Sequence, residues 1–396
     1  MLTNLPFGPA DILLPKADFE RWACIACDQF TSQPEYWERA DAIAGDAPSA
    51  LRLILPEVYL GDGHDEARIK EINDTMRRYL ADGVFNEYKN AMICTERTQP
   101  DGRVRRGIVG AFALAEYSYE PGAKSLIRPT EGTVLSRIPP RVAIRRDAPL
   151  ELPHIMVFMD DRRREIIEEI DTSRLSKLYD FELMLGGGHL RGWLIDEAEQ
   201  QRILAALSEL ENESGTDGDR LLFAVGDGNH SLATAKAAAD VIGTDAAHYA
   251  LAELVNIHSE AISFEPIYRV LFGADTADAV RALHAAFPAQ DGRAVDYLTR
   301  GECGRVFVPG LETGEVQRFI DGYIEEHPEV RVDYIHGEDA VRALAAQEGA
   351  VGFLYGGIGK DELFSYVRKN GILPRKSFSV GHAEDKRYYV EARRIR

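Results

Sequence analysis

Residues 221–239 of this chain read LLFAVGDGNHSLATAKAAA. The five apolar residues at the start predict a buried strand, and the alanine-rich stretch from Ser231 predicts a helix. Gly226 and Gly228 predict a tight turn between the two. A strand, a turn and a helix in this order place unpaired backbone N–H groups and the positive end of the helix dipole at the turn. The stretch therefore predicts an anion site that suits a phosphate or a carboxylate.

Polar side chains accompany the two glycines of this turn. We expect Asp227 to hold a metal ion or orient a hydroxyl, and Asn229 and His230 to donate to phosphate oxygens. In an alternative interpretation without a ligand, the glycines only connect the strand to the helix, and His230 caps the helix or packs against its neighbours. A polar run at the end of a buried strand favours the functional interpretation. A dinucleotide fingerprint fits poorly, because Ser231 replaces its third glycine and the next acid, Asp240, falls inside the predicted helix.

A second polar stretch, residues 124–133, reads KSLIRPTEGT and is followed closely by four more arginines. Arg128 is the best candidate for an anion clamp, and Glu131 for a general base or a metal ligand. In an acidic chain, such a group fits recognition of a phosphorylated or carboxylated small molecule. The alternative is a solvated surface on which the arginines pair with Asp147 and Glu151.

A third stretch, residues 373–387, reads LPRKSFSVGHAEDKR. Its basic side chains could close over a polyanionic ligand, or it could be an exposed loop before a terminal strand at 388–392.

Cys24 and Cys27 have the spacing of half a zinc or redox motif, but the sequence has no second cysteine pair. Buried free thiols are therefore the expectation. Asp28 follows an apolar run and should have a partner, because a buried carboxylate is costly alone. We interpret His154 as a satisfied core or edge histidine.

The composition limits the partners. The chain has 396 residues, with 46 Lys and Arg against 65 Asp and Glu, and a formal net charge of −19. This charge repels polyanions, so we expect a small-molecule substrate, no nucleic acid and no membrane. The chain has four cysteines, no apolar stretch near the roughly 20 residues that span a bilayer, and no signal-like start. Together these features favour a cytoplasmic location. Whether the chain forms a homo-oligomer stays open.

The pattern along the chain predicts an α+β fold in two domains. Apolar spacing predicts a helix over 65–80, and strands at 91–94 and 108–114 form a hairpin about residues 100–102. A surface loop is expected at 211–219. Beyond residue 262, helices near 277–287, 315–325, 339–347 and 361–370 alternate with strands at 305–308, 330–335 and 351–355. We expect an N-terminal α+β domain, 1–262, with a mixed sheet and the phosphate-binding motifs, and a smaller C-terminal α/β domain, 263–396.

Four motifs together resemble the bacterial and archaeal domain-of-unknown-function family ten-fifteen over essentially the whole chain. They are Ser125–Thr133, Leu152–His154, Val225–Ser231 and Pro374–Ser377. Most members of that family carry Asp-Gly-His-His-Arg at the position of Asp227–Ser231. They also carry Arg-Pro-His-Glu-x-Thr at the position of Arg128–Thr133.

The Asp-Gly-His-His-Arg element resembles in turn the nucleotide-phosphate motif of the ParB/sulfiredoxin superfamily, which includes free-serine kinases. By this resemblance Asp227, Asn229 and His230 would contact nucleotide phosphates or the transferring group, with Glu131 as the base. The chain departs from the motif where Ser231 replaces the phosphate-binding arginine and Asn229 replaces the first histidine. Arg128 or Lys376 would then supply the missing charge.

We therefore expect a phosphotransferase that moves a phosphoryl group between ATP or ADP and a small hydroxyl metabolite, such as serine or a similar polar acid, with Mg²⁺ assisting. Glu131, Asp227 and His230 are the expected catalytic residues, and Asp227 the metal ligand. A sensor that binds a nucleotide or metabolite without chemistry, and a phosphatase that uses water as acceptor, stay as alternatives. The expected phosphate- or nucleotide-binding residues are Arg128, Thr133, Gly226, Gly228, Asn229, Ser231, Lys376 and Ser377.

Overall fold

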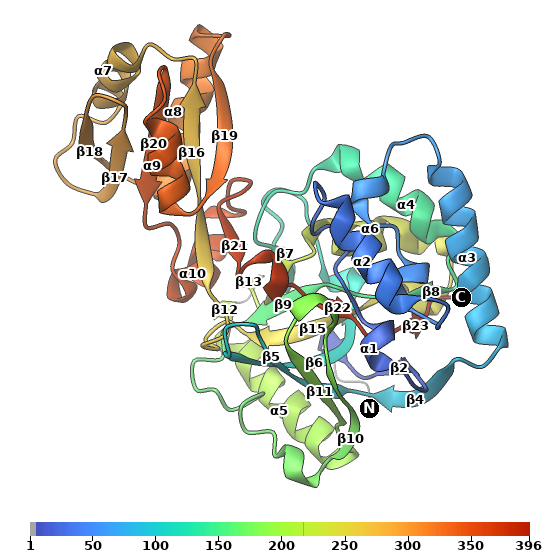
Figure 1. Ribbon diagram of the computed structural model, residues 1–396. Helices are drawn as coiled ribbons and strands as arrows, with labels where there is room; N and C mark the ends of the chain where they lie inside the picture. The colour runs from blue at the N-terminus through green and yellow to red at the C-terminus, as the bar shows by residue number, and fades with distance from the viewer. Residues whose placement is uncertain (1–4, 217) are drawn as a thin grey trace. The chain divides into compact units, whose positions relative to one another are not determined.

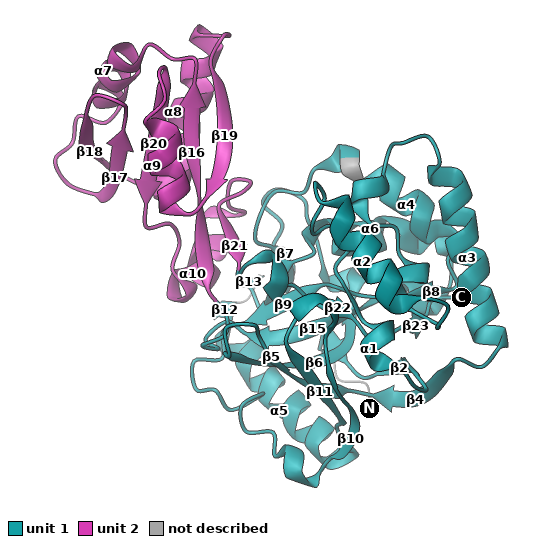
Figure 2. Cartoon of the chain, in the orientation of Figure 1, with its two compact units in different colours: residues 1–262, 381–396 teal, residues 263–380 magenta. Residues whose placement is uncertain are grey.

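The computed structural model describes residues 5–216 and 218–396. The chain forms two compact units, Met1–Ile262 with Gly381–Arg396 and Ser263–Val380 (Figure 2). The second unit therefore ends earlier than the predicted domain 263–396. The reason is strand pairing: β22 (Tyr388–Tyr389) pairs with β3 (Cys24–Ile25), and β23 (Arg393–Arg394) pairs with β8 (Leu150–Glu151).

Unit 1 is built around a mixed sheet, so the predicted α+β class is confirmed (Figure 1). Strands β14 (Phe223–Asp227) and β7 (Ile127–Pro129), and strands β15 (Tyr249–Asn256) and β9 (Met156–Met159), pair in parallel, while the remaining neighbours are antiparallel. β1 (Phe7–Gly8) also pairs with β6 (Val104–Ala113). The sheet order is β10 (Ser176–Glu182), β11 (His189–Leu194), β5 (Ile93–Thr98), β6 (Val104–Ala113), β15 (Tyr249–Asn256), β9 (Met156–Met159), β14 (Phe223–Asp227) and β7 (Ile127–Pro129).

Two hydrophobic cores cover the two faces of this sheet. Alternate residues of β6 enter different cores, Val109 the first and Ile108 the second, as the two-residue period of a strand requires. The first core also contains buried side chains of α1 (Phe19–Trp22), α2 (Pro34–Ala44) and α3 (Asp65–Ala81). The second core contains those of α5 (Glu197–Glu213) and α6 (Asn229–Ile242). α4 (Ile138–Arg146) packs along α6, and β2 (Ala10–Pro15) pairs with β4 (Phe85–Ala91).

The segments with a strong hydrophobic periodicity in the sequence form the predicted secondary structure. The predicted helix over 65–80 is α3, and the predicted hairpin is β5 and β6. The predicted surface loop at 211–219 is observed only in part, and its residue 217 lies outside the described residues. Its first three residues continue α5, because glutamates tolerate a helix well, and Gly215 then opens a small hairpin of β12 (Gly215–Thr216) and β13 (Asp219–Arg220). Within the described residues, no helix is long and apolar enough to cross a membrane.

Unit 2 is a helix-covered sheet in which the predicted alternation of helices and strands is observed. Its strand pairs are antiparallel, in the order β18 (Cys303–Val308), β17 (Arg293–Leu298), β20 (Ala350–Tyr355), β16 (Phe264–Phe272) and β19 (Arg331–His336), with β21 (Phe378–Val380) on β16. The helices are α7 (Thr276–Ala286), α8 (Glu312–Glu326), α9 (Glu338–Ala345) and α10 (Lys360–Asn370).

A buried charge network attaches the C-terminal segment 381–396 to the sheet of unit 1. Glu253, on β15, accepts a hydrogen bond from Thr95 and forms ion pairs with Arg105 and Arg387. Arg387 also pairs with Glu391, and the two arginines and Glu253 are each at most 4% exposed. Because buried charges are stable only when paired, this network fixes the segment and hence the positions of its other side chains.

The network makes the stability of unit 1 depend on pH in the acid range. Burial raises the pKa of Glu253, but Arg105 and Arg387 outweigh it and hold that pKa below its usual 4.5. A carboxyl whose pKa is lower in the folded than in the unfolded state stabilises the fold at pH values above its unfolded-state pKa. This stabilisation is lost as the pH falls through the folded-state pKa. We expect the free energy of unfolding of unit 1 to decrease below about pH 4.5. Urea titrations followed by tryptophan fluorescence test this, since Trp22, Trp37 and Trp193 all lie in unit 1. A free energy constant from pH 5 to pH 3 would contradict it.

Candidate functional site

The predicted strand, turn and helix form the centre of the site. β14 ends at Asp227, Gly228 is the N-cap of α6 with φ at +77°, and the helix begins at Asn229. Neither position has room for a side chain, so both glycines are required. A Cβ at position 228 would lie 3.0 Å from the Ile155 Cα, and one at position 226 would lie 2.1 Å from the Phe158 ring. Gly226 therefore allows β14 to pack against β9, a role different from the predicted phosphate contact.

The second predicted stretch lies beside this turn. β7 runs parallel to β14, and after it the Thr130 hydroxyl donates to the Val225 carbonyl over 2.8 Å. The Val134 N–H then donates to His230 Nε2 over 3.1 Å. The half-buried residues Glu131 and Thr133 lie between these two contacts. Two distant stretches of sequence are thus brought together at the N-terminus of α6.

His230 has a different role from the predicted one at this nitrogen. Its Nε2 accepts the Val134 N–H, so it cannot donate there to a phosphate oxygen. The imidazole instead ties the segment after β7 to α6.

The guanidinium of Arg128 lies at the wrong end of the strands for the anion clamp that the sequence predicts. Arg128 Nε donates to the Ser125 carbonyl, and Nη2 donates to the Arg220 carbonyl over 2.8 Å. Nη2 also pairs with Asp219 at 3.2 Å. These partners precede β7 and β14, whereas the turn follows β14. The prediction of a phosphate contact fails because the buried guanidinium satisfies carbonyls where the two parallel strands begin.

Lys386 supplies the cation at the turn. Its ammonium lies 3.6 Å from Asp227 Oδ2, and its side chain is 10% exposed. In the part of the chain that the structure describes, Asp227 Oδ2 and Asn229 Oδ1 are buried and have no hydrogen-bond partner. Unsatisfied buried polar atoms are uncommon and indicate a missing partner. The turn therefore combines donors, in Lys386 and the first N–H groups of α6, with two oxygen acceptors.

His154 joins the site from the loop before β9. Its Nε2 lies 3.1 Å from the Ser231 hydroxyl and 3.9 Å from Asp28 Oδ2, and its Nδ1 lies 2.7 Å from the Tyr389 hydroxyl. The imidazole is 6% exposed. Burial raises the pKa of Asp28, but His154 and Lys386 outweigh it and hold that pKa below its usual value. Asp28 thus has the partner that its sequence context predicts.

Sequence reasoning interpreted His154 as a structural histidine and gave no role to Tyr389. The only signals were the carboxylate after an apolar run at Asp28 and the Leu-Pro-His motif of the resemblance. Neither indicates that His154 lies beside Ser231, since the two are 77 positions apart.

The predicted residues of the third stretch divide between the two units. Lys376 and Ser377 lie in unit 2, where the Lys376 ammonium is 4.6 Å from the centre of the Tyr334 ring. Ser377 is 1% exposed and its hydroxyl donates to the Pro374 carbonyl over 2.6 Å, so it does not present itself to a phosphate. Arg387 belongs to the buried network, whereas Lys386 lies at the turn.

Cys24 and Cys27 are free thiols, and the Cys27 backbone N–H donates to the Tyr389 hydroxyl over 3.2 Å. Burial and the Asp28 carboxylate raise the pKa of Cys27 to about 12, so it is protonated at neutral pH. Within the described residues, no group of three or more His, Cys, Asp or Glu side chains could hold a metal ion.

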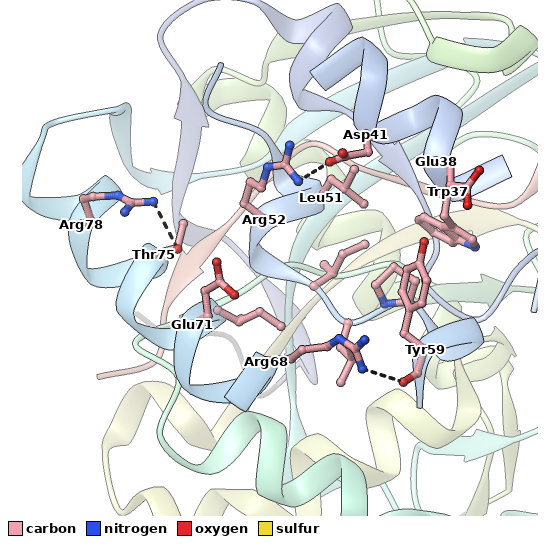
Figure 3. Close-up of a pocket in the computed structure, with 14 residues that line it drawn as sticks. Trp37, Glu38, Asp41, Leu51, Arg52, Tyr59, Arg68, Glu71, Thr75 and Arg78 are labelled. Carbon is pink, nitrogen blue, oxygen red and sulfur yellow. Dashed lines mark hydrogen bonds and ion pairs between the residues drawn. The ribbon is translucent and has the colours of Figure 1, made fainter. Parts of the chain in front are cut away.

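Unit 1 contains two cavities relevant to ligand binding. The larger, of about 510 Å³, lies between α2 and α3, and Figure 3 shows the side chains around it. Its arginines already have acceptors: Arg52 pairs with Asp41, Arg68 donates to the Tyr59 carbonyl, and Arg78 donates to Thr75. A smaller cavity of about 160 Å³ is lined by His154, Ser231 and Tyr389. We place the candidate site at the smaller cavity and the adjoining turn, because Ser231, a predicted phosphate-binding residue in the first turn of α6, lines this cavity, whereas none of the residues that line the larger cavity is a predicted site residue.

A family described as "Protein of unknown function (DUF1015)" matches residues 7–355. The chain belongs to this family. The DUF1015 match includes β14, the turn and the first turn of α6, together with β7 and His154. A search of curated proteins finds no match to this DUF1015 chain.

Solved structures similar to this DUF1015 protein include a free serine kinase in complex with AMP. It has a TM-score of 0.40 and 12% identity, over 71% of this chain and 90% of that one. A conserved hypothetical protein from Pyrococcus furiosus has a TM-score of 0.35 and 12% identity, over 71% and 90%. SbnI with a C-terminal truncation, from Staphylococcus aureus, has a TM-score of 0.38 and 11% identity, over 69% and 83%.

Proposed function

We propose that the turn at the N-terminus of α6 binds the phosphates of a nucleotide, and that unit 1 transfers a phosphoryl group between this nucleotide and a small hydroxyl metabolite. The observation that carries the proposal is the ion pair of Lys386 and Asp227 at that turn, whose side chains are 10% and 16% exposed. The ammonium, the first N–H groups of the helix and the helix dipole all favour negative charge at one point. Phosphoryl transfer depends mostly on such charge stabilisation and on positioning.

The two oxygens that accept no hydrogen bond account for the second reactant, the acceptor metabolite. A phosphate needs donors, which Lys386 and the backbone provide, whereas Asp227 Oδ2 and Asn229 Oδ1 can only accept. An acceptor hydroxyl or a cation satisfies such oxygens. We therefore assign Asp227 to the hydroxyl of the acceptor metabolite, and Glu131, held beside the turn by the contacts of Thr130 and Val134, to its proton.

Mg²⁺ fits this site only as an ion shared between the protein and the nucleotide. One buried carboxylate oxygen, Asp227 Oδ2, is available, and Mg²⁺ is commonly held by one or two carboxylates together with substrate phosphates. When bound, Mg²⁺ would neutralise phosphate charge. The chain's own contribution is to hold the phosphates with Lys386 and the helix N-terminus.

Nucleotide turnover with a panel of hydroxyl metabolites tests the proposal. We expect acceptor-dependent formation of ADP from ATP, and we expect Asp227→Asn to lower its rate by about 10²-fold or more, because the acceptor hydroxyl loses its carboxylate partner. Asp240→Asn, on the exposed side of the same helix, is the control and should retain the rate. Saturable nucleotide binding with the nucleotide unchanged after long incubation would overturn phosphoryl transfer and identify a binding module.

A further inference from the structure

The smaller cavity of unit 1 is lined by apolar side chains together with polar and charged ones. Its volume is about 160 Å³. Two ion pairs also border it, Arg141 with Glu57 and Arg145 with Glu151, and their charges neutralise each other. The apolar side chains of the lining include Leu55, Met76, Ile144, Ala148, Leu152 and Leu251.

The size and lining of the cavity select an apolar group. An enclosed apolar cavity of roughly 150 Å³ takes up a molecule the size of benzene, and this pocket, which is open to solvent, has a comparable volume. A group of about six carbon atoms therefore fills this cavity. A purine base fits its lining less well, because the ring nitrogens need hydrogen-bond partners and the bordering charged side chains are already paired.

The part of the lining formed by His154 and Ser231, which we call its polar end, is suited to a hydroxyl. His154 Nε2 and the Ser231 hydroxyl lie 3.1 Å apart there, and both line the cavity. The Tyr389 hydroxyl on Nδ1 fixes the orientation of the imidazole. Ser231 lies in the first turn of α6, four positions after Asp227. A hydroxyl at this end is therefore at the same helix terminus as the proposed phosphate site.

We infer that the phosphoryl acceptor is an amphipathic alcohol: its apolar substituent, about the size of a phenyl ring, occupies the cavity, and its hydroxyl accepts a hydrogen bond at His154 and Ser231 while it donates to Asp227, the carboxylate already assigned to it. The inference rests on the proposed function and narrows its substrate class. It replaces the expectation of a serine-like polar acid, because a small polar molecule would leave an apolar cavity empty. His154 acts as a positioning residue for the hydroxyl.

Binding of a fluorinated probe tests the cavity without relying on turnover. We expect 4-fluorobenzyl alcohol to bind the full chain saturably in ¹⁹F NMR titrations. Ala148→Leu fills the cavity and should weaken this binding at least tenfold, as should Leu152→Phe, which is the second variant if the first does not fold. Ala81→Leu, at an exposed position of α3, is the matched control and should leave binding unchanged.

A matched pair of probes isolates the role of His154. His154→Ala should weaken 4-fluorobenzyl alcohol at least tenfold but leave 4-fluorotoluene unaffected, since the toluene has no hydroxyl. Equal losses for both probes would show that His154 only maintains the fold and would overturn its assignment.

The outcomes for the cavity and for the proposed function are separable. Equal binding of 4-fluorobenzyl alcohol to wild type and both cavity variants, or no binding at all, overturns the inference. Displacement of the probe by adenosine also overturns it, because the cavity then holds the nucleobase. ATP turnover with serine as acceptor but not with benzyl alcohol overturns the inference while the proposed function stands. Probe binding that depends on the cavity, without turnover of any alcohol, overturns the proposed function.

Discussion

Replacing Lys386 by methionine is expected to lower the rate of nucleotide-dependent phosphoryl transfer by about 10²–10³-fold, the usual effect of removing one donor that stabilises developing negative charge. Lys386 is the cation beside Asp227 at the N-terminus of α6, and its side chain is 10% exposed. In such a partly dehydrated site, the ammonium interacts strongly with a phosphate, because little water screens the charges. Steady-state rates with saturating nucleotide measure the effect.

Two further variants separate a catalytic effect of Lys386 from a loss of folding. Lys386→Arg keeps the charge and should recover part of the rate. Lys177→Met, at a half-exposed position of β10, removes a lysine outside the site and should retain the full rate. If Lys386→Met unfolds unit 1, its tryptophan fluorescence will change, and Lys386→Arg then carries the test. A folded Lys386→Met protein with the wild-type rate would contradict the assignment.

Glu253→Gln is expected to reduce the free energy of unfolding of unit 1 by about 3–5 kcal/mol, the usual cost of breaking a buried ion pair on one side only. The amide retains the shape of the carboxylate but leaves Arg105 and Arg387 without their shared anion. Because Arg387 also holds the segment that carries Lys386 and Tyr389, the same change should lower activity. Urea titration followed by tryptophan fluorescence measures the stability.

Glu209→Gln provides the matched control for this change. It makes the same substitution at an exposed position of α5 and should alter stability by less than about 0.5 kcal/mol. Equal stabilities for Glu253→Gln and Glu209→Gln would show that the buried network contributes little to unit 1.

The fold was predictable where local signals are strong. The apolar period of α3, the strands on either side of the turn at residues 100–102 and the strand before Gly226 depend on neighbours in the sequence, so the sequence alone locates them. The return of residues 381–396 to unit 1 was not predictable, because it depends on pairing between β22 and β3, more than 360 positions apart, and on the buried partners of Arg387. Such pairings have no local signature.

The candidate site was predictable in its backbone and less so in its side chains. The turn, the helix N-terminus and the adjoining segment after β7 were expected from the glycines and polar residues. The choice of Arg128 as the cation was wrong, since a sequence rich in arginines does not reveal that Arg128 is satisfied by carbonyls where β14 begins. Lys386 and His154 reach the site only through the tertiary fold, so their proximity to Asp227 and Ser231 needed the structure.

A crystal structure of the full chain with ADP and Mg²⁺ tests the central claim most directly. We expect a nucleotide phosphate at the N-terminus of α6, with its oxygens about 3 Å from backbone N–H groups of the first helical turn and from the Lys386 ammonium. A nucleotide bound elsewhere, such as in the larger cavity of Figure 3, with Lys386 still beside Asp227 and no phosphate at the turn, would contradict the account.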